Sequence, residues 1–547
     1  MAKVRGRFYS VLAPLLKRGV TLLMTATFTG MALTAQNVAE EDTQPRRIEI
    51  LSYGSMSQDS RIDSDRITLR DDVAIEHNQA LMWCDSAYFY DAKNRVIAFG
   101  NIRMSQGDTL NLYGDYLEYD GNTEKAFVEG NVVLIDKETH LYSDILNYDL
   151  KERVAYYDQG GKIVDGENTL TSTRGTYYSI EKVFHFSELV TVTGPDFFVT
   201  ADTMNYHNER ELVVFTGPTT VEGDSIFIYG HQGWYDMEER VSKIWDNAIV
   251  NNMSQEIMAD TIYYEELTGF GRARGDVRIT DMANNSVVTG GFAIYYREPE
   301  DIMITDIPSY EMMGDTDTLY MHADTLRAIT LPDYKEEEEE RADPIREEEE
   351  SEWNPDPDDP PRLVKGYYNT RIFSNDFQSI CDSLSYSFRD STITMFGSPV
   401  IWSEENQLTA DSITIFMSDN RIDRMELYHN AFVISEVDSG KYNQTRGRFI
   451  TGHFRDNNLY RVEVEGNGES IYYLVESDGL VGVNYSKSAS IEIMVEGSKV
   501  LQVTEFGNPD GTLDPPGDKD SAEYKLQGFR WLDYLRPTDR YDIFRRM

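Results

Sequence analysis

Aspartates recur at nearly regular intervals, and carboxylates are among the few side chains here that could do chemistry. Two facing carboxylates could act as acid and base on a glycosidic bond, and carboxylates with histidines could hold a metal ion. Seven aspartates begin similar short runs, as in DYLEY, DILNY and DTMNY: Asp85, Asp115, Asp144, Asp202, Asp260, Asp382 and Asp411. One aspartate per interval gives a row without partners, so we expect a structural role and no catalytic residue.

Other chemical motifs do not occur in the sequence. The eight histidines are scattered and lack metal-ligand spacing. Signatures of serine hydrolases, zinc proteases, thiol redox proteins and phosphate-binding loops are missing. Cys84 and Cys381 each stand directly before a repeat aspartate, in a position for small residues, and are expected to be buried free thiols. We therefore predict no metal, no cofactor and no enzymatic activity.

The aspartates mark a repeat. Aligned on Asp-x-x-x-aromatic, with arginine or histidine in two copies, successive anchors lie 28 to 30 residues apart, at positions 85, 115, 144, 174, 202, 231 and 260. A fixed period in this range is typical of stacked repeat architectures. Val, Ile, Thr and Tyr fill the repeats, which favours strands over helices. The predicted fold class is all-β.

The first run of each repeat predicts a strand with one apolar face. Because side chains alternate between faces, Asp115, Leu117 and Tyr119 should lie on the same side. A buried, unpaired carboxylate is costly. We therefore expect the aspartate at the end of the apolar face, where it would accept hydrogen bonds from backbone amides at a corner.

The second run predicts a strand that bends at a glycine. In AFVEGNVVL the inward set would be Ala126, Val128, Gly130, Val132 and Leu134. Glycine within a strand permits a sharp bend or a close approach. Stacked bends would fold the strands into two facing walls with an apolar interior, and a fully packed core is the alternative. The other glycines at this position are Gly100, Gly217, Gly275 and Gly397.

An apolar interior between two walls would suit acyl chains, because burying each methylene contributes about 0.8 kcal/mol. The residues predicted to line it come from both runs of several repeats. They are Ala98, Ile102, Leu117, Tyr119, Val128, Gly130, Val132, Leu146, Tyr148, Met204, Tyr206, Ile262 and Tyr264.

Composition and segment boundaries limit the partners and the location. A net charge of −44 argues against nucleic acid. Basic residues before a short apolar run at the N-terminus predict a signal peptide and export. Consecutive glutamates and Pro-Asp alternation predict an acidic disordered insert. The predicted parts are a signal peptide (1–36), a leader (37–47), a repeat array (48–331), the insert (332–362), a second, looser array (363–505) and a loop with an aromatic and basic tail (506–547).

The recurring D-x-x-x-Y, turn, apolar run and G-N-V pattern behind a signal peptide resembles the OstA-like, or LptA-like, family of periplasmic lipopolysaccharide-transport proteins. The resemblance covers about residues 48–300 well and 363–505 more loosely. It implies an open, V-shaped β-jellyroll whose apolar groove shields lipid A acyl chains and whose ends associate edge to edge. The chain departs from the smaller family members in its length, its insert and its C-terminal segment.

These observations lead to one hypothesis and two alternatives. The hypothesis is a non-enzymatic periplasmic lipid-binding or bridge protein, with lipopolysaccharide or another lipid as ligand and OstA-like envelope proteins or further copies of itself as partners. An association with the outer membrane is left open. The first alternative is a packed β-solenoid scaffold for envelope proteins. The second is an exported carbohydrate-active β-helix enzyme.

Overall fold

The fold is all-β, as predicted. A computed structural model describes residues 47–331 and 362–546, with gaps at 60, 62, 224–225, 253–254, 283–284, 299, 315–316, 419–420, 456–457, 477–478, 497–498, 516 and 518–523. The predicted signal peptide, the leader up to residue 46 and the acidic insert up to residue 361 lie outside the described residues. Over the described part, no helix has the length and apolar character needed to cross a membrane.

The strands of the first part of the chain are β1 Glu49–Ser52, β2 Ser55–Gln58, β3 Arg66–His77, β4 Ala80–Tyr90, β5 Arg95–Gln106, β6 Leu110–Asp120, β7 Lys125–Asp136, β8 Thr139–Asp149, β9 Val154–Tyr157, β10 Gly161–Asp165, β11 Asn168–Ser172, β12 Arg174–Tyr178, β13 Val183–Thr193, β14 Phe197–His207, β15 Leu212–Gly223, β16 Ile226–Asp236, β17 Val241–Asn252, β18 Gln255–Glu265, β19 Phe270–Asp281, β20 Ser286–Arg297, β21 Glu300–Thr305, β22 Ser309–Met313, β23 Thr318–His322 and β24 Thr325–Thr330. The later elements are β25 Arg362–Phe373, β26 Gln378–Ser387, β27 Thr392–Phe396, β28 Val400–Ser403, β29 Asn406–Thr409, β30 Ser412–Ser418, β31 Arg421–Asp438, β32 Lys441–Arg455, β33 Asn458–Glu476, β34 Gly479–Glu496, β35 Lys499–Phe506, β36 Asp510–Asp514 and the 3-10 helices η1 Asp533–Leu535 and η2 Asp542–Phe544.

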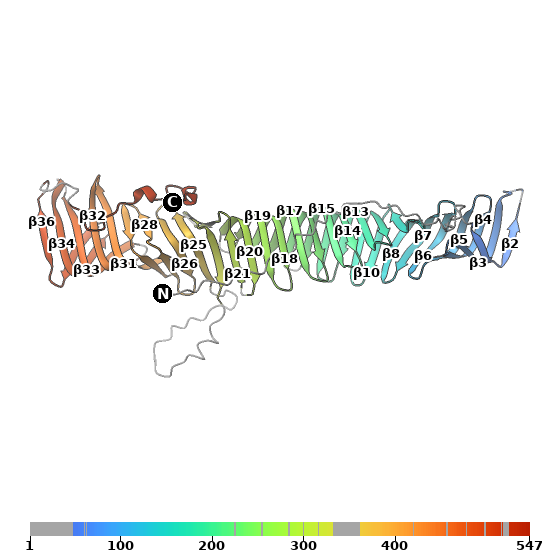
Figure 1. Cartoon of the computed structure of the whole chain (residues 1–547), viewed down its shortest axis with the longest axis horizontal. Coiled ribbons are helices and arrows are strands. Elements are labelled where there is room, and N and C mark those ends of the chain that lie inside the picture. The colour runs from blue at the N-terminus through green and yellow to red at the C-terminus, as the bar shows by residue number, and fades with distance from the viewer. Residues whose placement is uncertain are drawn as a thin grey trace, which may run out of the picture. The chain divides into compact units, whose positions relative to one another are not determined.

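The long strands pair antiparallel with the next strand of the chain, as in β3 to β8 and β13 to β20, so the sheet broadly follows chain order (Figure 1). In places two short strands replace one long strand, as where β9 and β10 pair with different halves of β8. The two predicted arrays are joined, because β23 and β24 both pair with β25. Strand β36, in the stretch predicted as a loop, pairs with β34.

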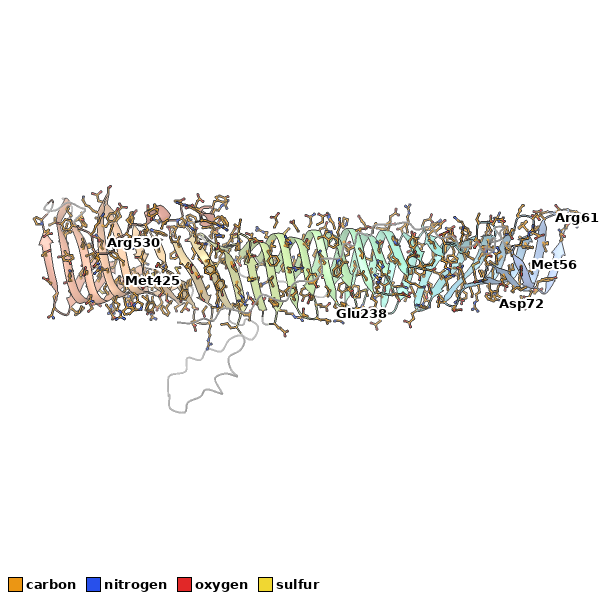
Figure 2. The ribbon with its side chains drawn as sticks, viewed as in Figure 1. Met56, Arg61, Asp72, Glu238, Met425 and Arg530 are labelled. Atoms are coloured by element: carbon orange, nitrogen blue, oxygen red, sulfur yellow. The ribbon has the colours of Figure 1, made fainter. Side chains whose placement is uncertain are left out.

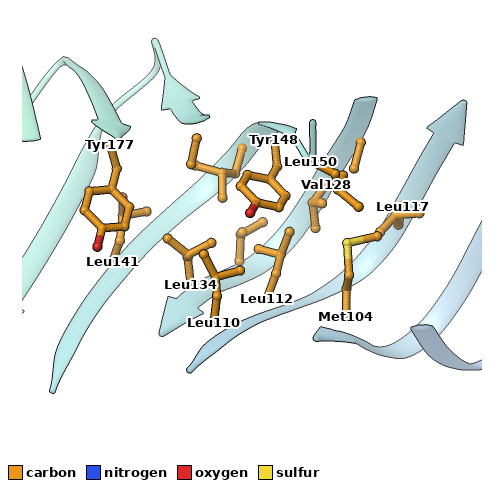
Figure 3. Packing of buried hydrophobic residues seen from close by; sticks show 14 of the residues in the cluster. Met104, Leu110, Leu112, Leu117, Val128, Leu134, Leu141, Tyr148, Leu150 and Tyr177 are labelled. Carbon is orange, nitrogen blue, oxygen red and sulfur yellow. The ribbon is translucent and has the colours of Figure 1, made fainter. Parts of the chain in front are cut away.

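Nearly every long strand is interrupted near its middle by a corner, a point where the pairing register shifts. In the β6–β7 pair the shift falls between Tyr113 and Tyr116. We call the half-strands that contain Leu112 and Leu134 wall A, and those that contain Leu117 and Val128 wall B. Side chains from both walls pack in one buried cluster, so the walls face each other across an apolar interior (Figure 3).

The repeat aspartates lie outside this interior, so the prediction that they share the apolar face is wrong. Asp115 is exposed at the corner, while Gly114 and Leu117 point inward. The register shift makes consecutive inward positions three residues apart instead of two, and this moves Asp115 to the outer side. There Asp115 accepts a hydrogen bond from the Asn131 side chain at 2.7 Å. The other six repeat aspartates are also exposed: Asp85, Asp144, Asp202, Asp260, Asp382 and Asp411.

The corner glycines sit against these aspartates. A Cβ atom added to Gly275 would lie 2.0 Å from Oδ2 and 2.8 Å from Cβ of Asp260, and Gly275 has a left-handed φ of 77°. Gly100, Gly130, Gly217 and Gly397 likewise approach the aspartate of the preceding strand. Close approach of neighbouring strands therefore requires glycine at these corners. Gly130 is consequently a corner residue and does not line the interior.

Replacing Gly275 with alanine should destabilise the sheet locally by about 2–4 kcal/mol, from the left-handed φ together with the collision with Asp260. The measurement is amide hydrogen exchange in β18 and β19. Gly107→Ala is the matched control, because Gly107 has a φ of 64° but no atom within 4 Å of the added Cβ. Equal losses in the two variants would show that the aspartate contact does not explain the glycine.

A C-terminal segment, residues 524–546, crosses the outer face of wall A over the later strands, and we call it the strap (Figures 1 and 2). The Gln444 side chain pairs with the strap backbone at Tyr524 and Leu526, both at 2.9 Å. Gln407 does the same at Arg530 and Leu532, at 2.7 and 2.6 Å. Each glutamine side chain thus gives the strap backbone one donor and one acceptor, as a neighbouring strand would.

The strap covers apolar side chains that point away from the interior. Tyr524 and Leu526 pack on Phe432, Ile434, Ile471, Tyr473 and Val483. Leu532 and Leu535 pack on Ile380, Val400 and Trp402, and Phe544 contacts the His322 ring. In β26 the outward Ile380 and the inward Cys381 are therefore both buried. Cys84 and Cys381 are buried free thiols.

Candidate functional site: the interior between the walls

Tyrosines from wall B reach across to polar residues of wall A at the rim of the interior. Among the described residues there are four such contacts, each between residues 41 or 42 positions apart, and we call them mouth latches. The pairs are His77 Nδ1 with the Tyr119 hydroxyl at 2.6 Å, and the hydroxyls of Tyr148, Tyr177 and Tyr206 donating to Gln106, Asp136 and Asp165 at 2.5, 2.6 and 2.7 Å.

The strand ends place the latch residues. His77, Gln106, Asp136 and Asp165 are the last residues of β3, β5, β7 and β10, all at the free rim of wall A. The tyrosines stand near the ends of β6, β8, β12 and β14, at the rim of wall B. Burial raises the pKa of all four tyrosines, and the Asp136 and Asp165 carboxylates raise it further for their partners. The phenols therefore stay protonated and able to donate.

The Asp136 latch contains an ion pair. Asp136 is 3% exposed and also accepts hydrogen bonds from Lys182 Nζ at 2.5 Å and Thr109 Oγ1 at 2.9 Å. Burial alone would raise the pKa of Asp136, but the hydrogen bonds from Lys182, Tyr177 and Thr109 outweigh it and hold the pKa below its usual value. Asp136 is therefore a carboxylate at neutral pH.

The series of latches ends after Asp165. At the next two equivalent positions wall A has Gly194 and Gly223, which have no side chain to accept from Tyr235 or Tyr264. Tyr235 instead contacts Glu266 at 3.5 Å, and both tyrosines are partly exposed. We call β15–β18, residues 212–265, the open segment.

Burial of the interior changes at the same place. The equivalent inward residues of wall A are fully buried at Leu112, Leu141 and Leu170. Val199 occupies this position in β14, the strand of the last latched tyrosine, and Ile228 and Ile257 occupy it in the open segment. All three are partly exposed. Ile226 at the rim is 39% exposed. The inward apolar residues of wall A near the rim are therefore buried under the first latches and partly exposed from β14 through the open segment, where the residues nearer the corner, such as Ala248 and Ala259, stay buried.

The structure places the predicted interior residues in three settings. Ala98, Ile102, Leu117, Tyr119, Val128, Val132, Leu146, Tyr148, Met204 and Tyr206 are buried together in the first cluster, between the latched walls. Ile262 is buried in a separate cluster within and beyond the open segment, and Tyr264 is partly exposed at its rim. Gly130 lies at a corner. The interior of the latched part is filled by side chains.

A pocket of about 450 Å³ lies where the latches end. Its lining is largely polar, and Met237 is one of its few apolar residues. Asp136, Asp165, Lys182 and Tyr206 contribute to it, so the last two latches form part of its wall. The described residues contain no group of three or more His, Cys, Asp or Glu side chains that could hold a metal ion.

The latch partners His77, Gln106, Asp136 and Asp165 were not predicted from the sequence. Of their tyrosines, Tyr119, Tyr148 and Tyr206 were predicted as interior residues without a polar role, and Tyr177 was not predicted. A signal does exist, because a polar residue ends an apolar run at positions 77, 106, 136 and 165, and glycine replaces it at 194 and 223. The spacing of 41 or 42 residues becomes meaningful only once the walls are known to face each other.

Comparison with known proteins agrees with the resemblance found in the repeats. Residues 46–202 match the family described as OstA-like protein. This part of the chain is OstA-like. The OstA-like region contains three complete mouth latches and Asp165 of the fourth. Its match ends before the open segment begins.

One solved structure that matches is that of LptH from Pseudomonas aeruginosa, described as the LptA homologous periplasmic component of the lipopolysaccharide transport device. It is 14% identical, with a TM-score of 0.19, and the match covers 20% of this chain and 81% of that chain. No curated protein matches the chain.

Proposed function

We propose that the protein is a non-enzymatic lipid-binding protein of the cell envelope, which shields acyl chains between its two walls during outer-membrane assembly. The observation that carries the proposal is the partial exposure of apolar side chains on the inner face of the open segment, as at Ile228 and Ile257. The OstA-like region supports lipopolysaccharide as the lipid and a bridging role in its transport.

The interior favours a hydrocarbon over a peptide. The backbones of β14 to β19 pair with one another along both walls. A peptide entering between the walls would leave its own backbone N–H and C=O groups without partners, which is costly. An acyl chain has no such groups and gains from each methylene that it buries.

Export and partners are part of the same proposal. The N-terminal signal-like sequence supports a periplasmic location. At the two ends of the sheet, β1 and β2 pair only with β3, and β35 and β36 pair only with β34, as far as the structure describes the chain. Such edges can pair with strands of other OstA-like proteins or of another copy.

A packed scaffold remains the second candidate, and the latched part favours it. Between β3 and β13 the inward side chains fill the interior and most of them are buried. That stretch could serve protein contacts through its outer faces alone. The two candidates differ in what the open segment binds.

Site-specific photo-crosslinking tests the proposed function. An aliphatic diazirine amino acid at Ile257, which faces the interior, should label purified lipopolysaccharide added to the full-length protein. The same residue at neighbouring Met258, which is 38% exposed and points outward, is the matched control. We expect at least fivefold more labelling from Ile257. Equal labelling at both positions, or none at either in a folded protein, would leave the scaffold as the better description.

Phosphatidylethanolamine vesicles provide a second arm of the same experiment. Labelling by lipopolysaccharide alone would support a transport role for that lipid. Labelling by both lipids would support acyl-chain binding without headgroup selection. It would then contradict the proposed preference for lipopolysaccharide but not the binding of lipid.

A further inference from the structure

The mouth latches and their interruption divide the interior into a closed and an open part. Latch positions on wall A recur at 77, 106, 136, 165, 194 and 223, and the facing tyrosines at 119, 148, 177, 206, 235 and 264. Only the wall A partner is lost at the end of the series, while the tyrosine persists. The series of latches therefore ends because glycine replaces the acceptor on the rim of wall A in two successive repeats.

The position of Gly223 matches that of a latch residue in the strand register. Asp136 is the last residue of β7 and pairs with Leu110 of β6. Gly223 is the last residue of β15 and pairs with Phe197 of β14. Tyr264 follows Gly223 by 41 residues, the separation of Tyr177 from Asp136. An acceptor at position 223 would thus occupy the place that Asp136 has in its own repeat.

We propose that lipid enters the interior laterally through the open segment, and that the mouth latches exclude it from the stretch between β3 and β14. This inference rests on the proposed function and adds where the ligand enters and which residues set the limit. Gly194 and Gly223 define the entry, and the four latched tyrosines close the mouth beside it. A lipid moving on between the latched walls has to break the latches one after another.

The occupant is an acyl chain, for two reasons already given by the geometry. The side chains exposed inside the open segment are aliphatic, and the wall backbones have their hydrogen bonds satisfied within the sheet. The pocket at the last latches adds polar groups at the rim, next to Met237. A headgroup that stays at the rim would meet this polar surface while its chains lie inside.

The central test builds a latch where the chain lacks one. Gly223→Asp supplies an acceptor opposite Tyr264, and its added Cβ lies 3.2 Å from Ile226 Cγ2, which requires only a small shift. Gly194→Asp is unsuitable, because its Cβ would lie 2.3 Å from the Phe197 ring. We expect Gly223→Asp to lower lipopolysaccharide labelling from a diazirine residue at position 257 at least fivefold.

The matched control removes the donor of the new latch. In Gly223→Asp combined with Tyr264→Phe the carboxylate remains but has no phenol to accept from, so labelling should return to within twofold of the unmodified chain. An equal reduction in both variants would mean that charge or bulk at the rim is responsible, and would overturn the role of the latch. No reduction in Gly223→Asp would overturn the proposed entry.

The reciprocal test opens an existing latch. Leu141 lies seven residues before Tyr148, as Ile257 lies seven before Tyr264, and it is fully buried. A diazirine residue at position 141 should give little labelling in the otherwise unmodified chain and at least threefold more after Tyr148→Phe. Strong labelling at 141 without that change would show that lipid enters everywhere, which contradicts the inference and leaves the proposed function intact. Absence of labelling at 257 would instead count against the proposed function itself.

Discussion

Replacing Asp136 with alanine is expected to reduce the local stability of β7 and β12 by about 3–5 kcal/mol, the cost of leaving a buried charge without its partner. Lys182 is 17% exposed and its ammonium group lies on the Asp136 carboxylate at 2.5 Å. Tyr177 and Thr109 lose their acceptor at the same time. Amide hydrogen exchange in β7 and β12 measures the loss, because it reports local opening in a repeat array.

A second substitution identifies the cause of that loss. In Asp136→Ala combined with Lys182→Met no unpaired ammonium group is buried, so more than half of the lost protection should return. If the double variant is as unstable as Asp136→Ala, the loss comes from the cavity and the missing hydrogen bonds instead of the charge.

The same residue predicts a pH dependence. The pKa of Asp136 is lower in the folded chain than in the unfolded chain, so the folded state binds its proton less readily. Its contribution to stability is fully present above the unfolded pKa of about 3.9 and is lost as pH falls through the lower folded pKa. Protection of β7, corrected for intrinsic exchange, should decrease below pH 4. Asp136→Asn should remove this part of the acid dependence, and an unchanged slope would contradict it.

Ending the chain at residue 523 is expected to destabilise the later strands and to expose a large apolar surface. Trp402, Phe432 and Ile471 are buried beneath the strap on the outer face of wall A. Each large apolar side chain buried contributes about 1.5–3 kcal/mol. The truncated protein should bind the dye ANS and lose amide protection in β28, β29 and β31, while β4 to β8 keep theirs.

A milder variant separates loss of the strap from failure to fold. Gln407 is 0% exposed, and both ends of its amide pair with the strap backbone. Gln407→Ala should loosen residues 530–532 and lower protection in β29 by about 1–3 kcal/mol, since two buried backbone groups lose their partners. Unchanged protection and no dye binding in both variants would show that the strap adds nothing to the array.

Much of the fold follows from the sequence, because it rests on local rules. Period-two alternation placed Val128 and Val132 inward on either side of Gly130, and both are buried in the same cluster. The same rule failed for Asp115, because the corner between Gly114 and Leu117 changes the inward spacing from two to three residues. Inward and outward side chains alternate along one straight strand, and at a register shift the alternation starts again one position later.

The latches and the strap could not be predicted by such rules. The Asp136–Tyr177 contact joins two strands that are not hydrogen-bonded neighbours, so it depends on how far the corners fold the walls together. The strap is held by Gln378, Gln407 and Gln444. In the sequence these glutamines look like solvent-exposed residues, but in the structure they point outward and are buried beneath the strap. Contacts between the two walls, and contacts between wall A and the strap, can be predicted only when the complete fold is known.

The chain-order pairing of the strands has a consequence for how the protein acquires its structure. From β3 on, each strand pairs with its predecessor or with a strand at most three elements earlier, so contacts form over short sequence separations and folding can proceed from either end or from the middle. A chain that emerges N-terminus first, during synthesis or during the proposed export, can add strands in the order in which they emerge. The strap is different, because its contacts with Gln444, Gln407 and Gln378 join residues 80, 125 and 158 positions apart. It can close only on strands that already exist, so its docking would be the final step of assembly.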